Sequence, residues 1–149
     1  MSTNNRRRDR AAGRRNARRD YVNISSEIFH DCDAEGREVG EGRRVLAVSV
    51  PIVVRHHREK PGGESLAVGE VSAGSLDLAL NVLGELYPPA SDGEEPRRCK
   101  VNLVSATAYR HHEDFCKEFL APMEPDGGRI PLRRIRSWVE DRERFTKGK

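Results

Sequence analysis

The sequence predicts an α+β fold, in which a small antiparallel sheet from the N-terminal half packs against about three helices. Segments rich in β-branched residues are concentrated before residue 72, whereas apolar residues recur at helical spacing after residue 75. The first 19 residues are rich in arginine and poor in apolar side chains, so we expect a disordered basic tail. Strands followed by helices, rather than a strict alternation, are typical of the α+β class.

The length and the composition predict one domain. A chain of 149 residues has room for a single compact domain, which we expect at residues 20–149, after the tail at residues 1–19. The three cysteines are widely spaced, which argues against a disulfide framework and favours a reducing cytosol. The longest apolar stretch, residues 45–54, has ten residues, about half of the ~20 that a membrane-spanning helix needs. No apolar segment follows the arginines as in a secretory signal, so we expect no membrane partner and a cytoplasmic location.

The strand signals lie in the first half of the body. In chain order the candidates are YVNIS (21–25), EIF (27–29), VLAVSV (45–50), IVVR (52–55) and LAVGEV (66–71). DCDAEG (31–36) has turn residues, and REVGEGRR (37–44), with two glycines, is predicted to be a short hairpin or loop. Pro51 divides the strongest signal, and we expect it at a bulge or an edge because proline donates no ladder hydrogen bond. HHREKPGGES (56–65) is predicted to be a polar loop.

The first helix is predicted to begin at Ser75. Ser75 is a suitable N-cap, and Asp77 lies in the first turn, where a carboxylate suits the helix dipole. The residues at helical spacing are Leu76, Ala79, Leu80, Leu83 and Leu86, widened by Leu78 and Val82. We therefore expect a helix that is buried on much of its circumference and that ends before Pro88.

Two further helices follow a candidate strand at CKVNLVSA (99–106). The second helix is predicted to end at Pro122, and its expected face consists of Tyr109, His112, Phe115, Cys116, Phe119 and Leu120. MEPDGGRI (123–130) is predicted to be a turn, and Pro131 suits a first helical position. The expected stripe of the third helix consists of Leu132, Ile135, Trp138, Val139, Arg142 and Phe145.

The tail is the best candidate for a contact surface. Residues 1–19 contain eight arginines and one aspartate, a net charge of +7, so the rest of the chain has −4 of the total of +3. Clustered arginines neutralise phosphates, which predicts salt-dependent contact with DNA or RNA, and bound as a helix the tail would present a cationic face, as in arginine-rich peptides inside an RNA hairpin. The candidate nucleic-acid-binding residues are Arg6, Arg7, Arg8, Arg10, Arg14, Arg15, Arg18 and Arg19. The alternative is a solvated tail that has no specific partner.

Histidine and cysteine pairs are candidates for metal or nucleophile chemistry. His112 and Cys116 are four residues apart, a spacing that can direct two ligands to one site. The same face carries Phe119, however, so packing in the core explains Cys116 more simply. The remaining candidates are His30, Cys32, His56, His57 and His111. Because no second short-spaced pair recurs, we expect no metal and no other cofactor, and we assign no catalytic residue.

Three other patterns have both a functional and a structural interpretation. GEVSAGS (69–75) has glycines five apart before a helix, as in a phosphate-binding loop, but Ser75 stands where a lysine is needed. The acids on the second helix are expected to form a solvated face; they are Glu113, Asp114 and Glu118. RIPLRRIR (129–136) either forms a second basic surface with Arg97, Arg98 and Lys100 or is a solvated face beside a buried stripe, and we favour the solvated face.

Three stretches carry a resemblance to a known family. They are GSLDLALNVL (74–83), HEDFCKEFLAPM (112–123) and GGRIPLRRIRSWV (127–139), and together with their spacing they cover about half of the chain. Their pattern resembles a family of small uncharacterised proteins, a domain of unknown function found in bacteria, archaea and their phages and plasmids. The chain departs from the pattern at Cys116 and by its long arginine tail. The resemblance implies a compact α+β body and a mobile-element context, but no active site.

Two hypotheses about function follow from these observations. The first is a non-enzymatic accessory protein of a mobile element, whose arginine tail contacts nucleic acid. The second is a protein-binding module, in which the acidic body binds a partner and the tail contributes solubility or electrostatic steering. An enzyme that uses His112, Cys116 and Glu113 ranks third.

Overall fold

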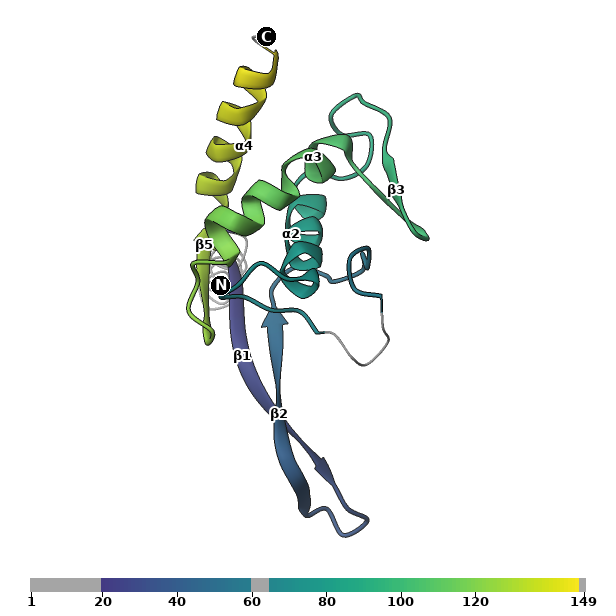
Figure 1. Cartoon of the computed structure of the whole chain (residues 1–149), viewed down its shortest axis with the longest axis vertical. Coiled ribbons are helices and arrows are strands. Elements are labelled where there is room, and N and C mark those ends of the chain that lie inside the picture. Colours follow the sequence, from purple (N-terminus) through teal and green to yellow (C-terminus); the bar gives the residue numbers. More distant parts are fainter. Residues whose placement is uncertain (1–19, 60–64, 148–149) are drawn as a thin grey trace, which may run out of the picture. The chain divides into compact units, whose positions relative to one another are not determined.

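The computed structural model describes residues 20–59 and 65–147 and confirms the α+β class (Figure 1). Its internal contacts divide the chain into two compact units, which we describe separately. The terminal unit comprises residues 1–23 and 129–149, and the central unit comprises residues 24–128. Whether residues 20–149 form a single domain therefore stays a prediction.

A long hairpin is formed by β1 (Tyr21–Cys32) and β2 (Glu38–Val48), which pair in antiparallel register from Ile24 with Val48 to Cys32 with Glu38. Asp33 closes the turn, because its Oδ1 accepts hydrogen bonds from the backbone N–H groups of Glu35 and Arg37 at 3.0 and 2.9 Å. Figure 1 shows the closed end of the hairpin extending away from α2 and α3, two helices of the central unit. The strand predicted at 21–25 is confirmed, and residues 38–44, predicted to be a hairpin or loop, belong to β2.

The strand β5 (Gly127–Pro131) joins the sheet in the order β2-β1-β5. The backbone N–H of Ser26 donates to Asp126 O, and that of Leu132 donates to Asp20 O, so the two strands run antiparallel. Gly127 has a φ of +105°, and a Cβ there would lie 2.0 Å from Ile24 O, so only glycine fits this position. The prediction of a turn across 123–130 was therefore wrong for its last four residues.

Two predicted strands are absent from the described chain. Residues 52–55 and 66–71 have no regular secondary structure there, although both are rich in branched residues. The strand predicted at 99–106 is a short separate hairpin, β3 (Arg97–Cys99) with β4 (Asn102–Val104). Tertiary contacts override β propensity here, because the backbone of residues 53–58 finds its partners on a helix rather than on a strand.

The helix α2 (Ala73–Leu86) is the centre of the central unit's core. Its fully buried apolar residues are Leu78, Ala79, Leu80, Val82 and Leu83. The N-cap is Ser72, three residues before the predicted cap. Ser75 is the third helical residue and completes a capping box, because its Oγ accepts from the backbone N–H of Ser72 at 2.7 Å.

The helix α3 (Ala106–Phe115) packs on α2 and continues into a π-helical turn, η1 (Cys116–Leu120). The Ser105 side chain caps α3 by accepting from the N–H of Ala108 at 3.1 Å. The aromatic rings of Phe115 and Phe119 stack with centroids 4.8 Å apart. The predicted apolar face is thus confirmed at its C-terminal part, and the helical segment ends before Pro122, as predicted.

The helix α4 (Leu132–Lys147) belongs to the terminal unit. Ile135 and Val139 are buried, as the predicted stripe requires, but Phe145 is 77% exposed, so the stripe ends before it. Pro131 is the last residue of β5 and not the first of the helix. The Arg142 guanidinium lies over the ring of Trp138, 4.8 Å from its centroid. This cation–π contact explains why an arginine stands within the apolar stripe. None of the described helices has the length and apolar character required to cross a membrane.

Candidate functional site

The eight arginines of the tail lie outside the described residues. Their role in binding nucleic acid therefore stays a prediction.

The two units have opposite net charges. By sequence the terminal unit contains 16 basic and 5 acidic residues, a net charge of +11. The central unit contains 11 basic and 19 acidic residues, a net charge of −8. The charge asymmetry is therefore larger than the +7 and −4 that follow from separating the tail alone. A polyanion that approaches the chain is attracted by one unit and repelled by the other.

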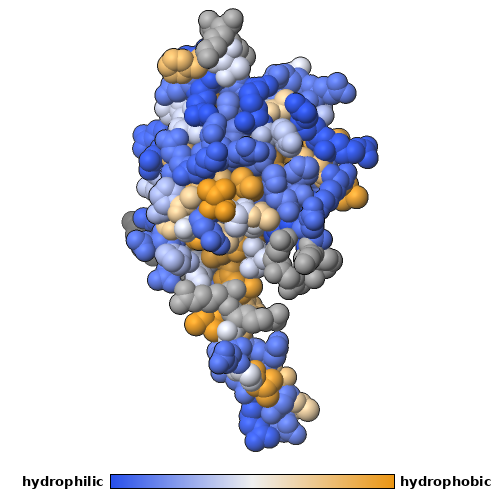
Figure 2. Space-filling view, viewed as in Figure 1, coloured by the Kyte–Doolittle hydropathy of each residue, from blue (hydrophilic) through white to orange (hydrophobic). Residues whose placement is uncertain are grey.

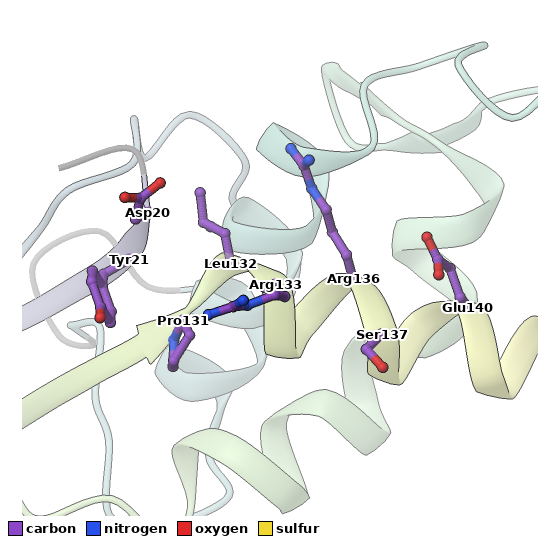
Figure 3. Close-up of a pocket in the computed structure, with 8 residues that line it drawn as sticks. All are labelled: Asp20, Tyr21, Pro131, Leu132, Arg133, Arg136, Ser137 and Glu140. Atoms are coloured by element: carbon purple, nitrogen blue, oxygen red, sulfur yellow. The ribbon is translucent and has the colours of Figure 1, made fainter. Parts of the chain in front are cut away.

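A cavity of about 840 Å³ lies within the terminal unit (Figure 3). Asp20, which directly precedes β1, Tyr21 of β1 and Pro131 of β5 line it together with five residues of α4. The five are Leu132, Arg133, Arg136, Ser137 and Glu140. Both arginines are exposed, and Figure 3 shows their side chains leaving the helix in different directions. Guanidinium and hydroxyl groups bind phosphate. The carboxylates of Asp20 and Glu140 reduce the positive charge of the cavity lining.

The second basic surface considered from the sequence divides between the two units. RIPLRRIR belongs to the terminal unit, whereas Arg97, Arg98 and Lys100 lie on or beside β3 in the central unit. The Arg97 guanidinium lies over the Tyr109 ring at 5.2 Å, and Lys100 Nζ donates to Arg58 O at 3.1 Å. These two cations therefore have structural contacts within the central unit.

The polar residues Asp77 and Asn81 of α2 hold a segment that has no regular structure, residues 52–59. Asn81 Oδ1 accepts from the backbone N–H groups of Val53 and Val54, both at 2.8 Å, and its Nδ2 donates to Val54 O at 2.8 Å. One turn earlier, Asp77 Oδ1 accepts from the N–H groups of His56 and His57 at 3.0 and 2.8 Å. Side chains thus supply the partners that a neighbouring strand would otherwise supply.

Asp77 is a buried anion, and it lies beyond the first turn of α2, in which the sequence placed it. Its side chain is fully buried, and its Oδ2 accepts from the Nε of Arg58 at 2.8 Å and from the backbone N–H of the same residue at 3.2 Å. Burial alone would raise the pKa of Asp77, but the hydrogen bonds from His57, Arg58 and His56 outweigh burial and lower the pKa below 3.8. The prediction of a first-turn position was wrong because the helix is capped by Ser72 and not by Ser75.

The 52–59 segment brings His57 to His112 of α3. The two Nε2 atoms are 2.9 Å apart, and His112 Nδ1 lies 2.5 Å from the carbonyl oxygen of Tyr109. A carbonyl oxygen only accepts, so His112 Nδ1 carries a proton and donates it. In the neutral pair, His112 Nε2 is therefore an acceptor, and His57 Nε2–H donates to it. His56 lies beside this pair, with its ring centroid 4.8 Å from that of His57.

Burial is the main cause that lowers the pKa of both paired histidines below 6.5. For His57 the Asp77 carboxylate opposes this shift and His56 adds to it, while Glu113 raises the pKa and Lys100 lowers it. For His112 the hydrogen bond to Tyr109 opposes burial. The pair is therefore neutral near pH 7.

Acidification below about pH 6.5 is expected to lower the free energy of unfolding. The unfolded chain protonates His57 and His112 near pH 6.5, whereas the folded chain protonates them at lower pH. The unfolded state thus binds more protons in this interval, and stability is lost as the pH falls until the folded pKa values are passed. Folding lowers the pKa of Asp77 from 3.8, so protonation of this carboxylate causes a further loss of stability only below about pH 3.8.

Urea unfolding at about pH 7.5, 6 and 5 measures this slope. A chain with both His57→Gln and His112→Gln should show a flatter dependence in the same interval, because it lacks both groups. Stability that is constant or rises from pH 6.5 to 5 would contradict the expected protonation states.

The proposed pairing of His112 with Cys116 is not formed. Cys116 is buried, and its Sγ donates to Ser75 Oγ at 3.3 Å, whereas His112 contacts His57 and Tyr109. Burial raises the pKa of the Cys116 thiol, which disfavours the thiolate that a nucleophile needs. Among the described residues no group of three or more His, Cys, Asp or Glu residues is arranged around a metal position. Glu113 and Glu118 are exposed, in agreement with a solvated face.

The sequence did not predict the roles of Asn81, Arg58 and His57. One signal was present, since Asp77 and Asn81 are polar residues four apart within an otherwise apolar helix. Comparison of the chain with models of protein families, with curated proteins and with solved structures found no match. The family resemblance therefore stays a prediction.

Proposed function

We propose that this chain is a non-enzymatic, cytoplasmic accessory protein of a phage or other mobile element, and that its terminal unit binds DNA or RNA through the arginine-rich tail. The observation that carries the proposal is the separation of charge, with +11 in the terminal unit and −8 in the central unit. Eight of the 16 basic residues of the terminal unit are the arginines of the tail. Arginine suits the task because its guanidinium binds phosphate through two parallel hydrogen bonds and stacks on bases.

The helix α4 extends this basic character beyond the tail. Arg133, Arg134 and Arg136 are exposed, and Arg133 and Arg136 form no ion pair with another described residue. Both also line the cavity beside Asp20, the residue that directly follows the tail in the chain. A nucleic-acid backbone bound by the tail would thus find further phosphate-binding groups in the same unit.

Deletion of residues 1–19 is expected to lower the affinity for nucleic acid on the order of 10²-fold at low salt. Each arginine that neutralises a phosphate releases a counterion, so full engagement of the tail gives a slope of log K against log salt of up to about −7. Fluorescence anisotropy with duplex DNA, single-stranded DNA and an RNA hairpin, each over a salt series, measures both quantities. Equal binding by the full and the shortened chain, or no binding by the full chain at low salt, would refute the proposal.

A charge-matched pair of variants separates local contact from net charge. Arg133→Gln with Arg136→Gln removes two charges from the terminal unit, and we expect a slope smaller in magnitude by about 1–2. Arg37→Gln with Arg110→Gln removes two charges from the central unit, where both arginines already pair with carboxylates. This control pair should leave the slope unchanged, whereas equal effects would indicate that only net charge matters.

The alternative is a protein-binding module, and the hairpin favours it. Its large apolar side chains are exposed, with Ile28 at 61%, Phe29 at 59% and Val39 at 44%. At the closed end of the hairpin, at the bottom of Figure 2, hydrophobic residues lie among hydrophilic ones. Residues 27–45 contain six acidic and three basic residues, so a partner would present apolar groups within a basic surface. Pull-down with the chain without its tail tests this function, because a protein-binding module keeps its protein partners without residues 1–19. Loss of every protein partner would remove the alternative.

A further inference from the structure

His112 has the hydrogen-bonding arrangement of a metal ligand. Its Nδ1–H donates to the carbonyl oxygen of Tyr109, which leaves the lone pair of Nε2 directed at His57. Histidines that bind metals almost always donate their other ring N–H to a carbonyl or carboxylate, because this bond selects the tautomer and orients the ring. The second Nε2 atom, that of His57, lies 2.9 Å away on a different element.

We propose that His57 and His112 bind a transition-metal dication, such as Zn²⁺ or Ni²⁺, between their two Nε2 atoms. With metal–nitrogen distances of about 2.05 Å and a tetrahedral angle, the two nitrogens would be about 3.3 Å apart. The observed 2.9 Å is about 0.4 Å shorter, a change within ordinary side-chain displacement. Imidazole nitrogen suits zinc, nickel and copper, whereas magnesium and calcium require oxygen ligands.

The surroundings favour a cation at this position. The Asp77 and Glu113 carboxylates favour positive charge at His57, whereas His56 and Lys100 oppose it. The His56 ring lies beside that of His57, and its buried Nδ1 has no hydrogen-bond partner among the described residues. His112 is buried but His57 is only half-buried, so the metal enters from the side of the 52–59 segment. Solvent completes the coordination of this two-point site.

The protons balance without a further reactant. In the neutral pair His57 carries its proton on Nε2, and on metal binding this proton leaves Nε2 while Nδ1 takes up one, so the ring remains neutral. His112 keeps its proton on Nδ1. No net proton is released when both rings are neutral.

The test is titration of untagged full-length chain with ZnCl₂, NiCl₂ and MgCl₂ by isothermal calorimetry. The background carries Cys32→Ser, because Cys32 is exposed and lies two residues from His30, a competing pair of ligands. We expect one Zn²⁺ or Ni²⁺ per chain and no heat with Mg²⁺. His57→Gln and His112→Gln should each weaken binding by at least about 10-fold, and His30→Gln, a histidine on the hairpin, should leave it unchanged.

A second measurement does not depend on variants that fold. Paramagnetic Co²⁺ added to the unmodified chain should broaden the imidazole NMR signals of His57 and His112 before those of His30 and His111. Broadening at His30 first, or binding that neither glutamine variant weakens, would overturn the proposal. Absence of Zn²⁺ and Ni²⁺ binding up to millimolar concentration would also overturn it and leave a hydrogen-bonded pair only.

Discussion

Replacement of Asp77 by alanine is expected to lower the free energy of unfolding by about 3–5 kcal/mol. The fully buried carboxylate accepts hydrogen bonds from three consecutive backbone N–H groups, those of residues 56–58, and from the Arg58 side chain. Alanine leaves these donors without their acceptor and Arg58 without its counter-charge in a site where that side chain is only 13% exposed. Urea unfolding followed by circular dichroism measures the loss.

Two further variants test the physical reason for this effect. Asp77→Asn keeps an acceptor for His56 and His57 but turns an amide toward Arg58, so we expect a loss smaller than that of alanine. Asp141→Ala removes an exposed carboxylate that is 3.8 Å from Arg144, and should change the stability by no more than about 0.5 kcal/mol. A loss below about 1 kcal/mol for Asp77→Ala would mean that Asp77 does not hold the 52–59 segment.

The same substitution at two glycines of α2 is expected to have opposite effects. At Gly74 an alanine Cβ would lie 1.9 Å from the backbone carbonyl oxygen of Ser65, and a backbone atom cannot rotate away. Gly74→Ala should therefore cost about 3 kcal/mol, the upper end of the usual cost of overpacking. At Gly84 no atom lies within 4 Å of the added Cβ. Gly84→Ala should stabilise the helix by about 0.5–1 kcal/mol, because alanine loses less backbone entropy.

Thermal and urea unfolding of the two variants measure the difference. Because both changes add one methyl group to the same helix, helix propensity alone predicts a gain at both positions. A Gly74→Ala chain as stable as the unmodified one would show that residues 65–67 do not approach the start of α2 so closely.

The candidate site was predictable in its charge but not in its geometry. The count of arginines in residues 1–19 is a property of the sequence, and it was sufficient to predict a polyanion-binding tail. The histidine pair was not predicted, because His57 and His112 are 55 residues apart and the spacing that drew attention was that of His112 with Cys116. Helical spacing places those two residues on one face, yet their functional atoms contact different elements: Cys116 contacts Ser75 of α2, and His112 contacts the 52–59 segment.

By itself the sequence determined the α+β class, the burial of α2 and the basic character of the N-terminus. These properties follow from local periodicity and from charge counts, which are independent of how distant segments meet. The tertiary structure alone decided that residues 52–55 are not a strand, that Asp77 is buried and that β5 joins the sheet beside β1. In each case the deciding interaction joins residues about 20 to 100 positions apart, because buried backbone groups take whatever partners the fold brings near.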